Sequence, residues 1–179
     1  MSTPERIGTA IAVAVAMGAC ASPPSERMGP NLGRVATAEE IAGWDRSIPP
    51  SGAGLPAGSG TARQGAAVYA AKCAACHGEK GAGKPADALA GGIGTLATAK
   101  PLRTVGSYWP YATTLFDYVR RAMPINAPLS LTDEEVYAVS AYVLYLNGIV
   151  AENAVMTAST LPRVRMPNRD GFIDEWRKR

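Results

Sequence analysis

The sequence contains a single histidine, His77, among 179 residues. A zinc site of two cysteines and two histidines needs a second imidazole, and so does a haem iron that is bound by two histidines. Both kinds of site are therefore excluded. The excess of one sign of charge is small as well. The net charge is +3 and the central part of the chain has no run of lysine and arginine, so nucleic acid is not expected as a partner.

Long apolar runs and alternating patterns are missing too. The most apolar segments, residues 7–19 and 136–146, are shorter than the ~20 residues that a membrane-spanning helix needs. No segment alternates convincingly between apolar and polar residues at the period of two that a half-buried strand requires. The sequence therefore predicts an all-α domain without a spanning helix.

The most informative motif is Cys73-Ala-Ala-Cys76-His77, the attachment signature of c-type haem. In such sites both sulfurs bind the porphyrin covalently, and the histidine takes one axial position on the iron. Their spacing of i, i+3 and i+4 places the three side chains on one face of a helix. One motif predicts one haem c. The main rival, a thiol–disulfide oxidoreductase, is disfavoured because its Cys-x-x-Cys begins a helix after a strand.

The N-terminal segment predicts export. Residues 7–19 form an uncharged, Ala/Val-rich run followed by small residues, which is typical of a signal peptide over residues 1–21. Cys20 lies where a lipoprotein signal would place its acylated cysteine. The alternative is ordinary cleavage after Ala21, with Cys20 discarded. We expect a periplasmic protein, either free or held to the membrane by a lipid at Cys20.

Residues 22–60 are rich in proline and glycine and predict an extension of linker type. Within it, Thr37 and Glu40 form a capping-box pattern that predicts a short helical turn. Trp44 follows, either packed back on the domain or anchoring a partner. The C-terminal extension, residues 149–179, is either loosely ordered or a strap that packs through Leu161, Phe172 and Trp176.

Residues 61–148 form the expected haem domain. Helical spacing predicts a first helix from Thr61 to about Cys76, followed by a haem-wrapping loop over residues 78–106. A second helix is expected from Pro110 or Tyr111 to Ala122.

A third helix begins at the capping box of Thr132 and Glu135, with Leu131 and Val136 placed for a hydrophobic staple. It ends at Asn147, which Gly148 follows. Because this helix is apolar nearly all round, it should be covered on more than one side.

The sixth iron ligand must be something other than histidine, and a methionine thioether favours reduced iron. Met123 ends one helix and precedes both Pro124 and a capped helix, so we predict that it is this ligand. Met166, which also precedes a proline, is the alternative. Tyr108 and Trp109, just before the second helix, are candidate haem contacts, with plain packing as the other interpretation.

In its order of elements the chain resembles the class I cytochrome c family over residues 61–148. The resemblance implies an all-α class I cytochrome c fold with extended N-terminal and C-terminal segments. In that family the first and last helices cross with small and aromatic residues in contact. Gly65 and Tyr69 match on the first helix, and Tyr142 matches on the last.

A wider resemblance, over about residues 35–175, is to the cytochrome subunit of bacterial sulfane/sulfite dehydrogenases of sulfur oxidation. In that family the cytochrome accepts electrons from a molybdenum-cofactor catalytic subunit, and some members carry two haems. With one attachment motif, this chain is expected to carry one. Four segments carry the resemblance: AEEIAGWD (38–45), GTLAT (94–98), VGSYWPYATTLFDY (105–118) and MPNRDGF (166–172).

The resemblance implies an electron-transfer protein that takes electrons from a molybdenum-cofactor dehydrogenase subunit and delivers them to a downstream cytochrome or oxidase. A six-coordinate iron has no free position for substrate, so the chain itself is not expected to be an enzyme. Two alternatives stay open. One is a general periplasmic carrier for another dehydrogenase, and the other is a haem module whose sixth position binds a gas or sulfur ligand.

Overall fold

The computed structural model describes residues 33–178. The predicted signal peptide and Cys20 lie outside them. The chain divides into two compact units, residues 1–42 and 43–179. Helix α2, Ala38–Trp44, begins at the predicted capping box: Thr37 N–H donates to Glu40 Oε2 at 2.9 Å and Glu40 N–H to Thr37 Oγ1 at 3.2 Å. It buries no residue. Trp44 is 91% exposed, so it does not pack on the domain.

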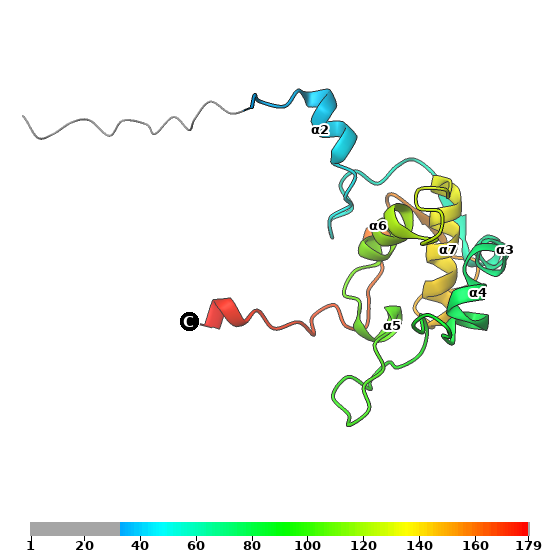
Figure 1. The fold of residues 1–179 in the computed structure, drawn as a ribbon. Coiled ribbons are helices and arrows are strands. Elements are labelled where there is room, and N and C mark those ends of the chain that lie inside the picture. The colour runs from blue at the N-terminus through cyan, green and yellow to red at the C-terminus, as the bar shows by residue number, and fades with distance from the viewer. Residues whose placement is uncertain (1–32, 179) are drawn as a thin grey trace, which may run out of the picture. The chain divides into compact units, whose positions relative to one another are not determined.

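The second unit is helical, and Figure 1 shows its arrangement. The all-α prediction holds apart from one pair of three-residue strands. In chain order the elements are β1 (Ser59–Thr61), α3 (Ala62–Lys72), α4 (Ala74–His77), the 3-10 turn η2 (Glu79–Gly81), α5 (Val105–Tyr108), α6 (Ala112–Ala122), α7 (Asp133–Leu146), β2 (Val155–Thr157), and the 3-10 turns η3 (Leu161–Arg163) and η4 (Glu175–Lys178).

The centre of the core is α7, which is buried on most of its circumference as expected. It begins at the predicted capping box, where Thr132 and Glu135 exchange hydrogen bonds of 3.0 and 3.2 Å. Leu131, just before the cap, packs against the core as a staple residue should. Phe116 of α6 packs on Tyr137 of α7 with ring centroids 4.5 Å apart.

Helix α3 crosses α7 at a point of very close approach. A methyl group at Gly65 would overlap the backbone carbonyl of Ala138, so only glycine lets the two helices meet this closely. One turn further on, the rings of Tyr69 and Tyr142 lie 5.2 Å apart. The crossing that the family resemblance implied, with glycine and aromatic residues in contact, is confirmed.

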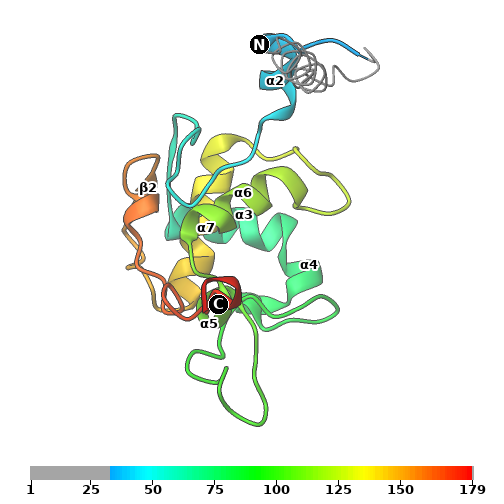
Figure 2. The ribbon, with the colours of Figure 1, turned by 90° about the vertical axis from the view of Figure 1, so that its left-hand side faces the viewer.

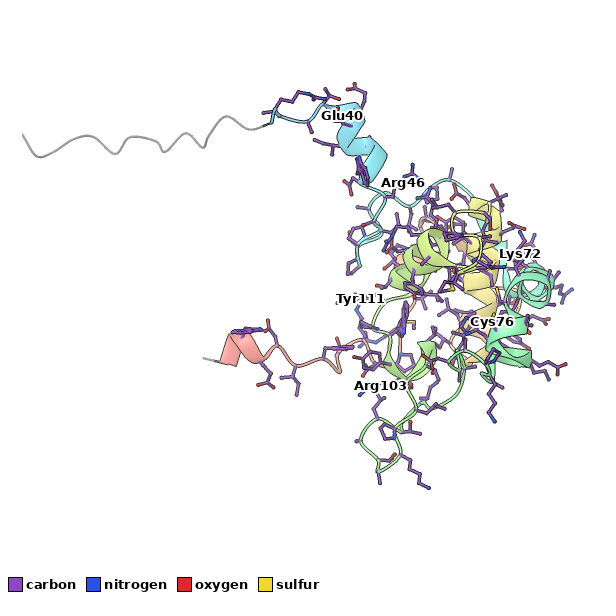
Figure 3. All side chains as sticks on the ribbon, in the orientation of Figure 1. Glu40, Arg46, Lys72, Cys76, Arg103 and Tyr111 are labelled. Atoms are coloured by element: carbon purple, nitrogen blue, oxygen red, sulfur yellow. The ribbon has the colours of Figure 1, made fainter. Side chains whose placement is uncertain are left out.

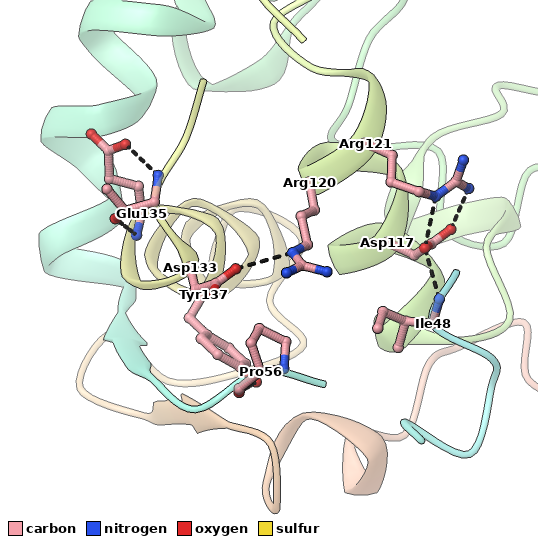
Figure 4. Close-up of polar contacts among 9 residues, drawn as sticks. Ile48, Pro56, Asp117, Arg120, Arg121, Asp133, Glu135 and Tyr137 are labelled. Atoms are coloured by element: carbon pink, nitrogen blue, oxygen red, sulfur yellow. Dashed lines mark hydrogen bonds and ion pairs between the residues drawn. The ribbon is translucent and has the colours of Figure 1, made fainter. Parts of the chain in front are cut away.

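The N-terminal extension is not a linker along its whole length. Ile48 is buried, and its N–H donates to Asp117 Oδ1 at 2.8 Å (Figure 4). Tyr137 donates its hydroxyl to the carbonyl of Pro56 at 2.8 Å. The linker interpretation is wrong over residues 48–60 because the turns in this segment have partners on α6 and α7.

Asp117 anchors this segment electrostatically as well. It is buried, which by itself would raise its pKa, but hydrogen bonds from Arg121 and from Ile48 N–H hold the pKa below its ordinary value. The Arg121 Nε–Oδ1 distance is 2.9 Å. The carboxylate is therefore charged at neutral pH, and it joins the extension to α6.

The strap interpretation of the C-terminal extension is confirmed in part. Strand β2 pairs antiparallel with β1, with Gly60 opposite Met156. Figure 2 shows β2 at the edge of the domain. Leu161 and Met166 are 0% and 1% exposed within the core. Trp176, by contrast, is 85% exposed, so this predicted strap contact is wrong. No helix among residues 33–178 is long and apolar enough to cross a membrane.

We predict that Gly65→Ala lowers the free energy of unfolding by about 1–3 kcal/mol, because the added methyl group forces α3 away from α7. The measurement is urea unfolding of the mature protein followed by circular dichroism. Gly43→Ala is the matched control, since apart from its chain neighbours and the backbone of its own helix no atom lies within 4 Å of the added methyl group there. Equal effects of the two substitutions would contradict the close crossing.

Candidate haem-attachment site

The motif residues lie on a separate helical turn after α3. Cys73 has φ −127° and ψ −38°, ends α3 and caps α4. The predicted continuous helix to Cys76 is therefore broken at Cys73. The turn re-forms at once, because the Cys73 carbonyl accepts from Cys76 N–H at 3.1 Å and from His77 N–H at 3.0 Å. The three side chains thus keep the helical spacing that the motif predicts. Neither cysteine is in a disulfide.

The imidazole of His77 is oriented by a backbone carbonyl. Its Nδ1 lies 2.9 Å from the carbonyl oxygen of Asp87. A carbonyl oxygen can only accept, so Nδ1 carries the hydrogen and Nε2 keeps the lone pair that an iron ligand needs. The partner lies in the loop that was expected to wrap the haem, ten residues after His77.

Two glycines fold the loop back onto the motif. Gly78 has φ +72°, and a methyl group there would overlap the Gly83 carbonyl. The carbonyl of Gly81 then accepts from Leu89 N–H at 2.8 Å and Ala90 N–H at 3.1 Å. These contacts bring the segment that contains Asp87 beside His77.

Burial sets the protonation of the groups behind the motif. Tyr69 is buried and donates to the Gly78 carbonyl at 2.9 Å, while burial, with a contribution from Cys73, raises its pKa to about 12. Burial likewise raises the pKa of the Cys73 thiol to about 11, although Lys72 opposes the shift. A redox-active cysteine needs a lowered pKa. The protonated thiol of Cys73 therefore disfavours the thiol–disulfide alternative.

Part of the predicted haem-wrapping loop is helical. Thr104 and Ser107 form a capping box at the start of α5, and Thr104 Oγ1 also donates to the Gly91 carbonyl at 2.6 Å. Sequence analysis missed this turn because serine, rather than glutamate, completes the box. The signal was present as Thr-x-x-Ser.

The predicted haem contacts are the last residue of α5, Tyr108, and its C-cap, Trp109. Tyr108 is 38% exposed, with Phe172 at 5.3 Å and the Arg103 guanidinium at 5.6 Å from its ring. Trp109 is half-buried and packs edge-on against Tyr118 at 5.8 Å. In the view of Figure 3, Arg103 and Tyr111 lie on the opposite side of the domain from Cys76.

The two candidate methionines occupy different environments. Met123 ends α6, where its N–H donates to the Val119 carbonyl at 3.1 Å, and its side chain is half-buried. Met166 is 1% exposed and belongs to the hydrophobic core. The structure thus brings Cys73, Cys76 and His77 together on one turn. Met123 comes from a separate element, the end of α6.

Comparisons with known proteins agree with this architecture. Residues 60–143 match the family described as "Cytochrome C oxidase, cbb3-type, subunit III". Among solved structures, the chain is similar to one from the sulfane dehydrogenase SoxCD of Paracoccus pantotrophus. The likeness has 41% identity and a TM-score of 0.77, and covers 84% of this chain and 75% of that chain. The search of curated proteins found no match.

The helical fold and these matches define the class of the protein: the chain belongs to the class I c-type cytochromes. Within that class it resembles the cytochrome of sulfane dehydrogenase. The family implies covalently bound haem c, and the motif fits this cofactor. Two free cysteines one turn apart supply the sulfurs, and the Asp87 carbonyl leaves His77 Nε2 available for iron.

We predict that Tyr69→Phe lowers the free energy of unfolding by about 1 kcal/mol through loss of the bond to Gly78. Burial raises the pKa of Tyr69 in the folded protein from its ordinary value of 10.0 to about 12. Its contribution is therefore complete below pH 10 and is lost as the pH rises towards 12, and the variant lacks this part of the alkaline decline.

Urea unfolding at about pH 8 and about pH 11 measures both effects. Tyr145→Phe is the control, since its hydroxyl makes no hydrogen bond within the described part of the chain. Identical alkaline slopes for the Tyr69→Phe variant and the wild type would contradict the assignment.

Proposed function

We propose that the chain is an exported cytochrome c with one haem that accepts electrons from a molybdenum-cofactor subunit oxidising sulfur compounds, and passes them to a downstream cytochrome or oxidase. The observation that carries the proposal is the likeness to SoxCD. At 41% identity it covers 84% of the chain, and so extends beyond the cytochrome segment 60–143 into the extensions. An electron carrier of general use would need only the haem domain.

In this proposal Cys73 and Cys76 hold the haem through thioether bonds, and His77 Nε2 is one axial ligand. The haem, when bound, supplies one-electron exchange at its iron. The chain's own residues set the conditions for that exchange. The Asp87 carbonyl fixes the imidazole through Nδ1, and the apolar core around α7 keeps water from the buried side of the site.

We assign the sixth position to Met123 rather than Met166. A ligand must present its sulfur to the haem, whereas Met166 is enclosed by core side chains and is 1% exposed. Met123 is half-buried at the end of α6. The half-buried Trp109 is the better proposed haem contact, because Phe172 and Arg103 already flank the ring of Tyr108. With both axial positions filled, the chain transfers electrons and does not catalyse.

Export and partner recognition complete the proposal. Residues 1–21 act as the signal that sends the chain to the periplasm, with Cys20 as its membrane anchor if it is acylated. Trp44 and Trp176 are 91% and 85% exposed, one in each extension. Exposed tryptophans of this kind are frequent anchors at protein interfaces, which supports a role for both extensions in binding the dehydrogenase.

A second function is favoured by the match to subunit III of the cbb3-type oxidase. It would be general electron delivery to an oxidase from whichever dehydrogenase is present. This alternative needs the haem domain alone and gives the extensions no role.

The test is co-expression of the chain with a molybdenum-cofactor sulfur dehydrogenase subunit in a host with haem maturation enzymes. We expect the subunits to co-purify, and the haem to be reduced on addition of sulfite or a sulfane compound only when the molybdenum subunit is present. Trp44→Ala with Trp176→Ala should weaken co-purification without changing the haem spectrum. Reduction by unrelated dehydrogenases at an equal rate would favour the general carrier.

We predict that Met123→Ala removes the methionine–iron charge-transfer band and lowers the reduction potential, because the thioether stabilises reduced iron. Absorption spectroscopy and redox titration of the purified protein measure these changes. Met166→Ala is the matched control. It should retain the band but lower the free energy of unfolding by about 2–5 kcal/mol through the cavity it leaves. The reverse pattern would assign the ligand to Met166.

A further inference from the structure

Asn147 connects the far end of α7 to the loop that carries the Asp87 carbonyl. It is 8% exposed and ends the helix. Its Oδ1 accepts from Gly91 N–H at 3.1 Å, and its Nδ2 donates to the carbonyl of Leu89 at 3.0 Å and to that of Val143 at 2.9 Å. One side chain thus binds a loop N–H and a loop carbonyl, and joins them to the last turn of α7.

The loop segment 86–91 is fixed at both ends. At its start, Ala86 N–H donates to the Cys76 carbonyl at 2.8 Å. At its end, Asn147 binds Leu89 and Gly91, while the Gly81 carbonyl accepts from Leu89 N–H and Ala90 N–H. The Asp87 carbonyl that accepts from His77 lies between these two fixed ends. The position of that carbonyl therefore depends on contacts made two to four residues later.

A helix end does not by itself require these contacts. The backbone N–H of Asn147 already bonds to the carbonyls of Leu144 and Tyr145, and only the Nδ2 bond to Val143 returns to the helix. The other two bonds of the amide go to the loop. The amide also packs closely against α5, because a methyl group at Gly106 would overlap it. The amide is therefore held in one orientation between α5, α7 and the loop.

We propose that Asn147 is a positioning residue for the proximal ligand: through Leu89 and Gly91 it sets the carbonyl of Asp87, and through that carbonyl the His77 imidazole. This inference rests on the proposed haem at His77. A strong bond from Nδ1–H to a carbonyl makes an imidazole a better electron donor to the oxidised iron. The amide at the end of α7 thereby tunes the reduction potential, although it belongs to neither the motif nor the loop.

The test uses the purified mature protein, with covalent haem verified by intact mass. We expect Asn147→Ala to raise the reduction potential, because a looser loop weakens the His77 bond to Asp87, and to shift the NMR signals of the His77 ring protons in the oxidised form. Asn147→Asp, which is nearly isosteric, retains an acceptor for Gly91 but no donor for Leu89. Its readout is the ring-proton shift, since its charge would itself move the potential.

Thr132→Ala is the matched control. It removes the cap at the other end of the same helix, away from the loop. It should lower the free energy of unfolding by an amount similar to that of the Asn147 variants. We expect it to leave both the potential and the ring-proton signals at their wild-type values. If the Asn147 variants match the wild type, or if Thr132→Ala shifts the signals as far as they do, the inference is overturned. Absence of covalent haem from the wild type would instead overturn the proposed function.

Discussion

The close approach of α3 and α7 is the constraint on which the rest of the structure depends. Gly65 allows the α3 backbone to lie against the Ala138 carbonyl, and Tyr69 packs on Tyr142 one turn later. Because the attachment turn follows α3 directly, this crossing determines where Cys73 and His77 lie relative to the core. The carbonyl of Gly78, which begins the loop, is in turn held by the hydroxyl of Tyr69. The site is therefore positioned from behind by apolar packing.

Local signals in the sequence predicted most of the fold. The capping boxes at Thr37 and Thr132 identified two helix starts because the paired side chains bond to backbone within one turn. The strands were missed because three residues are too few for a period of two to be recognised. The same limit applies to residues 48–60, whose glycines and prolines resemble a linker until Asp117 and Tyr137 supply distant partners.

Contacts of the candidate site between residues close in the sequence could be predicted, whereas contacts between distant residues could not. Cys73, Cys76 and His77 lie within one turn, so their spacing alone indicates the chemistry. The carbonyl partner of His77 comes from a loop, and its identity as Asp87 depends on where two glycines with positive φ fold the backbone. Asn147 bonds to Gly91 across 56 positions of sequence. No pattern in a single sequence indicates such a pairing.

The pairing of β1 with β2 has a consequence for the order of folding. Gly60 lies opposite Met156, so the two strands close a loop that contains every helix of the haem domain. Closing a long loop is entropically costly before other contacts shorten it. The strands should therefore pair only after α3 and α7 have packed together. In native-state hydrogen exchange they should open before the helices do.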